Sequence, residues 1–123
     1  MYTHQAIAEF KNFLELYPTD KNAPLAETKI KELRSKLALK EIKSAELYST
    51  MDDYKAATLY YDNIVNEYFD TEYADDALYG KIRMLILRKK YADARKEIER
   101  FETKFAGSNL LVKVKNLKTT LPL

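Results

Sequence analysis

Few residues in this sequence could carry out chemistry. The single histidine, His4, could act as a general base or a metal ligand only with convergent partners, and none is identifiable. The chain has no cysteine, so disulfides and thiolate metal sites are excluded. Acidic pairs at Asp52-Asp53 and Asp75-Asp76 lie beside expected turns or helix starts, where capping and solvation explain them better than metal binding. We therefore expect no catalysis, no metal and no cofactor.

Positive charge gathers in the last third of the chain. Residues 81–123 hold 12 Lys and Arg against 4 Asp and Glu, whereas residues 1–80 hold 9 against 15. A nucleic-acid patch could be formed by Arg88, Lys89, Lys90, Arg95, Lys96 and Arg100. On the same expected helix, however, the basic residues are interleaved with Glu97, Glu99 and Glu102. We therefore expect no nucleic-acid binding, and interpret the asymmetry as solvated faces or as an acidic helix pair that meets a basic neighbour.

The composition predicts an all-α fold. Of 123 residues, 46% are hydrophobic and 33% charged, and only two Gly and three Pro interrupt the chain. This balance supports a packed core without disorder, and strand-type alternation is absent. No apolar run reaches the roughly 18 residues of a transmembrane helix, and there is no signal peptide, so we expect the chain as given to be soluble.

One long helix, from about residue 24 to 51, organises the rest. Pro24 suits the first turn, where its missing N–H is no loss, and Asp52-Asp53 is the first plausible stop. At about 1.5 Å per residue the helix would span roughly 40 Å. Propensity alone cannot stabilise such a length, so other helices must pack along both of its ends.

Three segments repeat one helical pattern. A small residue is followed by large residues four, seven and eleven positions later, which is one face of a helix. The three sets are Ala6, Phe10, Phe13, Tyr17; Ala57, Tyr61, Ile64, Tyr68; and Ala94, Ile98, Phe101, Phe105. The second and third copies are 37 residues apart, close to the roughly 34 of a tetratricopeptide unit, whereas the first and second are 51 apart. The 14 additional residues fall in the long helix and amount to about four turns.

We therefore predict a single tetratricopeptide-like domain over 1–123, a right-handed solenoid of antiparallel helix pairs. Its expected parts are the second helix of an incomplete repeat (1–18), a repeat with an extended first helix (23–69), a further repeat (70–106) and a C-terminal capping helix (108–121). Gly107 is expected to end the preceding helix, and Ser108 or Asn109 to cap the last one. The first helix lacks its own partner, so we expect the natural protein to continue upstream and this chain to self-associate through the exposed apolar face.

The first helices of stacked pairs line the inner face of such a solenoid, which predicts a protein-binding surface. The residues expected on it are Ile42, Glu46 and Ser49 in one repeat and Tyr79, Arg83 and Ile86 in the next. Aromatic and Arg anchors are frequent among interface hot spots. Alternatively, Ile42 and Ile86 only pack within the solenoid. A second candidate surface is the basic end around Arg83, Arg88, Lys89 and Lys90.

The order of the parts is also informative. AIAEFKNFLELYP is followed by an over-long helix ending LALKEIKSAELYSTMDDYKAA, and then by YYDNIVNEYFDTEYADDALYGKIRMLI. Within this order of parts, the block from Leu37 to Ala77 is the most specific stretch of sequence. This order resembles the C-terminal half of the BamD family of outer membrane protein assembly factors, the ComL/YfiO-like lipoproteins, over nearly the whole chain.

The resemblance implies a non-enzymatic subunit of the machinery that inserts β-barrel proteins, held at the periplasmic face of the outer membrane by an N-terminal lipidated cysteine. In this family the C-terminal repeats dock the last periplasmic POTRA domain of the barrel subunit BamA. Two departures are the missing anchor cysteine with its N-terminal repeats, and Phe69, which stands where the family often has Pro. The alternative is another bacterial tetratricopeptide adaptor that binds a peptide in its concave groove, and the upstream sequence would discriminate between the two.

Overall fold

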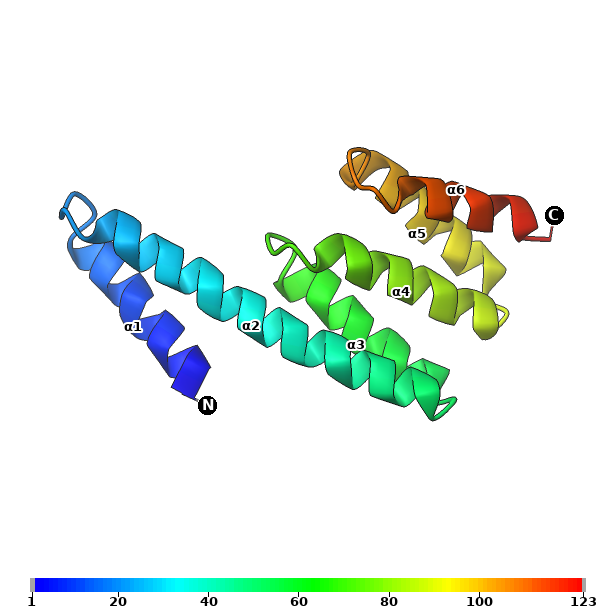
Figure 1. The fold of residues 1–123 in the computed structure, drawn as a ribbon, viewed down its shortest axis with the longest axis horizontal. Helices are drawn as coiled ribbons and strands as arrows, with labels where there is room; N and C mark the ends of the chain where they lie inside the picture. The colour runs from blue at the N-terminus through cyan, green and yellow to red at the C-terminus, as the bar shows by residue number, and fades with distance from the viewer. Residues whose placement is uncertain (1, 123) are drawn as a thin grey trace.

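The fold is all-α, as the composition predicts. The computed structural model describes residues 2–122, and the side chains of residues 3–122. Within them lie six helices: α1 (Tyr2–Leu16), α2 (Ala23–Thr50), α3 (Tyr54–Glu67), α4 (Ala74–Leu87), α5 (Tyr91–Lys104) and α6 (Leu111–Thr120). Each helix packs against the next in antiparallel pairs, an arrangement consistent with tetratricopeptide-like repeats (Figure 1).

The long helix is present almost as predicted. α2 spans 28 residues, with Pro24 in its first turn, and ends at Thr50, two residues before Asp52, which adopts a left-handed φ of 60°. Figure 1 shows α1 folded back along the N-terminal part of α2, while α3 and α4 lie beside its C-terminal half. The helix therefore joins two packed regions, as the 14 additional residues suggest.

The repeated face is buried in the second and third copies. Ala57, Ile64, Ala94 and Phe101 are all fully buried. The last aromatic of each copy lies just after its helix, and its amide donates to the carbonyl four residues earlier at 2.8 Å: Tyr17 to Phe13, Tyr68 to Ile64 and Phe105 to Phe101. In the first copy the face remains partly open, with Tyr17 56% exposed.

The main hydrophobic core runs from Ala38 in α2 to Leu121 after α6. The fully buried Val114 anchors α6 against α5, so the last helix covers the end of the repeat array. Farther toward the N-terminus, α1 packs against α2 outside the main core. The buried residues there are Ile7, Ala23 and Ala26.

The start of α6 differs from expectation. The helix begins at Leu111, and its N-cap, Leu110, makes no side-chain capping bond. Ser108 instead forms a turn before the helix: its hydroxyl accepts from the Leu110 amide at 3.1 Å and donates to Asp75 at 2.7 Å. Phe105 is the C-cap of α5, and Gly107 has no positive φ, so it does not act as a left-handed helix terminator.

Candidate protein-docking surface

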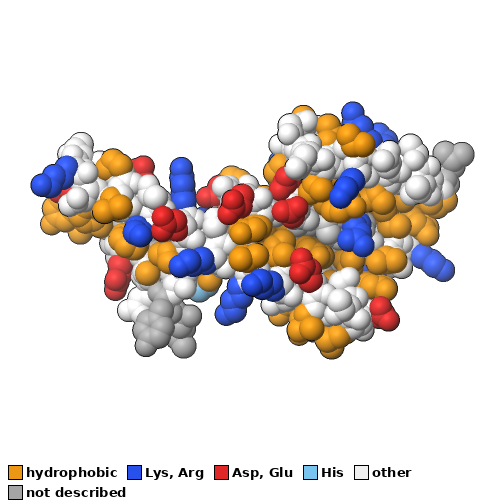
Figure 2. All heavy atoms as spheres, viewed as in Figure 1, with side chains coloured by type: hydrophobic (Ala, Val, Ile, Leu, Met, Phe, Trp, Pro, Cys, Tyr) orange, Lys and Arg blue, Asp and Glu red, His pale blue; other side chains and the backbone are white. Residues whose placement is uncertain are grey.

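A groove between α2 and α4 brings together four of the predicted binding residues: Ile42, Glu46, Tyr79 and Arg83. Its volume is about 390 Å³. The other lining residues are Leu39, Tyr61, Tyr73, Asp76 and Gly80. Figure 2 shows hydrophobic side chains gathered between these two helices, with acidic and basic side chains at the margins. The groove therefore offers the mixture of aromatic, aliphatic and charged groups found at protein interfaces.

Charges of both signs line the groove. The Arg83 guanidinium lies 5.7 Å from the centroid of the Tyr79 ring, one turn away on α4, which is a cation–π contact. Burial raises the pKa of the Tyr61 phenol; the Glu46 carboxylate raises it further, and Arg83 lowers it. Burial, then Asp75 and then Glu46, raise the pKa of the Asp76 carboxyl. Two acidic groups and one guanidinium therefore share the groove, and Glu46 acts on both Tyr61 and Asp76.

The two predicted isoleucines occupy different environments. Ile42 is 8% exposed and belongs to the main core, although it also lines the groove. Ile86 is half-buried against that core and lies outside the set of lining residues, as does the half-buried Ser49. Packing within the repeats, the alternative that the sequence left open, accounts for Ile86 and for most of the Ile42 side chain.

The three residues Arg88, Lys89 and Lys90 form the connection between α4 and α5, which we call the basic turn. Lys89 adopts a left-handed φ of 61°, and the Lys90 amide donates to the Leu85 carbonyl at 2.8 Å. The same geometry occurs 37 residues earlier, where Asp52 is left-handed and the Asp53 amide donates to Tyr48 at 2.9 Å. In both places a left-handed residue and an amide bond to the carbonyl five residues earlier end the helix, α4 in one case and α2 in the other.

The basic turn holds its two lysines in solvent. Lys89 and Lys90 are exposed, whereas Arg88, the C-cap of α4, is half-buried. The turn begins five residues after Arg83, which is about one and a half helical turns farther along the chain.

Each acidic pair includes a side chain with a structural partner. Asp53 caps α3 by accepting a hydrogen bond from the Ala56 amide at 3.1 Å, as predicted, and Asp75 accepts from the Ser108 hydroxyl. Over the part of the chain that the structure describes, no three His, Cys, Asp or Glu side chains are grouped in a way that could hold a metal ion. His4 is exposed and lines a separate groove, between α1, α2 and α3.

Comparison with known families decides the assignment. Residues 1–86 match the family model described as YfiO, an outer membrane lipoprotein. The chain belongs to the YfiO outer membrane lipoprotein family. The match contains the whole α2–α4 groove, whereas the basic turn lies beyond it. No curated protein matches the chain.

Membership in the YfiO family, which is BamD-like, gives the broad role. This YfiO protein takes part in outer membrane protein assembly, as a non-enzymatic assembly factor with protein partners. No helix among residues 2–122 combines the length and apolar character needed to cross a membrane.

One feature of this YfiO chain that sequence reasoning missed is the contact of Arg34 with the α3–α4 loop. The Arg34 guanidinium donates to both Asp70 carboxylate oxygens, at 2.7 and 3.1 Å, and to the Glu67 carbonyl at 2.5 Å. It also lies 5.2 Å from the centroid of the Tyr68 ring. The contact fixes the extended part of α2 to the end of the next helix. Because Arg34 and Asp70 are 36 residues apart, no local spacing indicates it.

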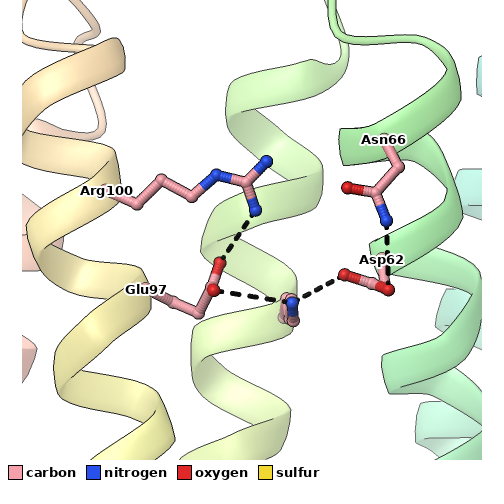
Figure 3. Close-up of polar contacts among 5 residues, drawn as sticks. Asp62, Asn66, Glu97 and Arg100 are labelled. Carbon is pink, nitrogen blue, oxygen red and sulfur yellow. Dashed lines mark hydrogen bonds and ion pairs between the residues drawn. The ribbon is translucent and has the colours of Figure 1, made fainter.

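A second missed feature is a charged network across three helices (Figure 3). The Lys81 ammonium on α4 lies 2.6 Å from Asp62 of α3 and 3.6 Å from Glu97 of α5. Arg100 donates to Glu97 at 3.3 Å, and the Asn66 amide donates to Asp62 at 3.3 Å. Here an acidic residue of the first part of the chain does meet a basic residue of the second.

Proposed function

We propose that this YfiO protein is the C-terminal half of a BamD-like scaffold at the periplasmic face of the outer membrane. Its basic turn and the adjoining face of α4 dock the last POTRA domain of a BamA-like barrel subunit. The observation that carries the proposal is the stacked pair of Tyr79 and Arg83 on α4, together with the exposed Lys89 and Lys90 in the turn that follows this helix. The resemblance to BamD supplies the identity of the partner.

The stacked pair and the two lysines have different roles. Exposed lysines act mainly on the rate of encounter and on its salt dependence, because solvent and ions screen them once the complex has formed. The stacked Tyr79 and Arg83 present a large, ordered contact area, of the kind that determines residence time. We therefore expect an acidic patch on the partner opposite the basic turn, with a deeper contact at Tyr79 and Arg83.

The experiment that tests the proposal is binding to the immobilised periplasmic region of BamA from the same source. Parent, Tyr79→Ala and Arg83→Ala chains are compared by surface plasmon resonance. We expect both variants to dissociate faster, by roughly 1–2 kcal/mol in binding free energy if either residue is a hot spot.

Groove variants distinguish the alternative. If Ile42→Ala or Glu46→Gln abolishes BamA binding while changes in the basic turn, Tyr79 and Arg83 leave it intact, BamA docks on the α2 side of the groove and the proposed surface is wrong. Failure of the parent chain to bind BamA at all would overturn the partner assignment.

A further inference from the structure

α1 is attached to the rest of the fold almost entirely by apolar contact. Among residues 3–16, Ile7 is the one buried side chain, at 8% exposed. Among residues 3–122, no side-chain hydrogen bond or ion pair joins α1 to another helix or loop. The Lys11 charge acts on Asp70 of the α3–α4 loop, but the two side chains form no ion pair. The half-buried residues of α1 are Thr3, Ala6, Phe10, Phe13 and Leu14.

Polar contacts join every later pair of neighbouring helices. The Asn63 amide of α3 donates to the Glu41 carboxylate of α2 at 2.6 Å. Lys81 of α4 lies within 3.6 Å of carboxylates on α3 and α5, and Lys118 of α6 lies 3.3 Å from Glu102 of α5. Over residues 3–122, α1 and α2 are therefore the one pair of consecutive helices without such a contact.

The part of α2 that packs against α1 buries little surface. Between residues 23 and 33 the buried side chains are Ala23 and Ala26, and the half-buried ones are Ile30 and Leu33, all on one helix face. Figure 1 shows α1 lying along this part of α2. Alanine methyl groups remove less apolar area from water than leucine or phenylalanine side chains, so they contribute less to stability. The main core and the hydrophobic residues packed against it begin only at Leu37.

Arg34 marks the point at which α2 is fixed to the next helices. Its guanidinium donates to both carboxylate oxygens of Asp70 and stacks on the Tyr68 ring, and the Arg34 side chain is only 19% exposed. Three residues later, Leu37 reaches the main core. The fold therefore has a weakly held part, which is α1 with α2 up to residue 33, and a strongly held part from Arg34 onward.

Release of α1 from α2 amounts to its unfolding. α1 has 15 residues, and a helix of that length is marginal in water without packing. The first turns of α2 behave differently: they extend a helix that stays folded and need no new nucleus, so they fray from Ala23 toward Arg34. Such local opening, below the free energy of global unfolding, occurs where few buried apolar contacts hold an element.

We infer that α1 is a latch, which opens as one unit while residues 34–122 keep their fold. The open state uncovers the apolar face of α2 from Ala26 to Leu37, and it removes one wall of the groove of about 500 Å³ that Ile7 and Leu37 line together. The contact between Arg34 and Asp70 stays closed and limits the opening. The latch belongs to the chain itself and does not depend on the docking of BamA.

Native-state hydrogen exchange followed by NMR tests the inference. The chain is studied at a concentration low enough that it sediments as a monomer, because association through α1 would hold the latch closed. We expect the hydrogen-bonded amides of α1, corrected for intrinsic rates, to exchange at least roughly tenfold faster than the slowest amides of α3 and α4. Protection should be uniform along α1 and graded along α2 from residue 26 to 33. A difference of less than tenfold between α1 and the slowest amides would overturn the inference.

Matched substitutions decide whether α1 opens independently. Ile98 is fully buried in the main core, so Ile98→Val should accelerate the slowest amides of α3 and α4 roughly threefold. The amides of α1 should keep the rates of the parent, because the Ile98 contacts persist while the latch is open. Ile7→Val, the same change in α1, should accelerate both sets, because it weakens the docked state relative to every open one. If Ile98→Val accelerates α1 as much as the core, α1 opens only with the whole chain and the inference fails.

Arg34→Ala locates the end of the opening unit. It should accelerate the amides of residues 34–37 and of the core roughly twofold to fivefold, as expected for a partly exposed ion pair. It should leave α1 unchanged, because the Arg34 contact remains closed when the latch opens. Lys36→Ala, at an exposed position two residues farther along α2, is the control and should change neither set. Equal acceleration of α1 and the core in Arg34→Ala would place this contact within the opening unit and contradict the inference.

Discussion

Tyr61 of α3 lies directly against the backbone of Gly80 in α4. A Cβ atom on Gly80 would lie 2.5 Å from both Cε1 and Cζ of the Tyr61 ring, closer than real Cβ atoms approach. Tyr61 is 7% exposed and lines the groove between α2 and α4. A residue without a side chain therefore sets both the spacing of α3 and α4 and the shape of the groove.

The first prediction follows from that contact. Gly80→Ala should destabilise the protein by about 1 kcal/mol, because overpacking against a fixed ring costs about 1–3 kcal/mol and the better helix propensity of Ala recovers only about 1 kcal/mol. The measurement is urea unfolding followed by circular dichroism. Gly107→Ala is the matched control, since a Cβ there meets nothing within 4 Å. Equal unfolding midpoints for Gly80→Ala and the parent would contradict this packing.

The second prediction concerns the small residue that opens the repeat pattern. Ala57 is fully buried between helices, so Ala57→Trp should unfold the protein or destabilise it by about 3 kcal/mol or more. Ala92→Trp places the same indole at an exposed position of α5 and should have little effect. Unchanged urea unfolding of Ala57→Trp would mean that the repeat alignment is wrong.

The third prediction is a pH dependence at Asp70. The hydrogen bonds from Arg34 lower the pKa of the Asp70 carboxyl below its ordinary value of 3.8, against a smaller opposing effect of burial. The ionised form is therefore stabilised by folding. This contribution is fully present above the unfolded pKa and is lost as the pH falls through the lowered folded value.

Asp70→Asn tests this dependence. At neutral pH it should cost about 1 kcal/mol or less in unfolding free energy, because the Asp70 side chain is 42% exposed and solvent screens the pair. The difference from the parent should shrink as the pH falls below 3.8. Asp20→Asn, an exposed position in the α1–α2 connection, is the control. A cost that stays constant down to the acid range would show that the Arg34 contact is not ionic.

The sequence predicted the features that depend on periodicity. The spacing of Ala57, Tyr61, Ile64 and Tyr68 identified α3, and Pro24 with Asp52 gave the bounds of α2 to within one residue. The expected inner face of the first helices likewise included Glu46 and Arg83, and both line one groove. Each of these follows from one helix and its expected neighbour.

The features that the sequence did not predict depend on contacts between distant residues. Arg34 reaches Asp70 because the extended α2 ends beside the α3–α4 loop, and Lys81 reaches Asp62 and Glu97 because three helices lie in register. Ser108 or Asn109 was expected to cap α6, but the N-cap is Leu110 and Ser108 binds Asp75 on another helix. Local propensity contains no information on such geometry.

The fourth prediction concerns self-association. Leu16 is 72% exposed and Leu25 59%, and a groove of about 480 Å³ lined by Phe10 and Phe13 opens beside Leu25. We expect concentration-dependent association through this face, because apolar patches of this kind favour contact. Analytical ultracentrifugation is the measurement, and Leu16→Lys with Leu25→Lys should restore the monomer.

The control for self-association changes two exposed apolar residues elsewhere. Leu59→Lys with Val112→Lys, at positions 64% and 68% exposed, should leave the association unchanged. A parent chain that sediments only as a monomer at high concentration would contradict the prediction.

The most direct test of the docking surface compares two charge reversals of equal size. Lys89→Glu with Lys90→Glu changes the basic turn, whereas Lys113→Glu with Lys115→Glu makes the same change at exposed positions of α6. Association with the immobilised BamA periplasmic region is measured at low and at high salt. We predict that the first pair slows association and flattens its salt dependence while the second does so much less, because steering acts mainly near the contact. Equal association rates for the two pairs would contradict docking at the basic turn.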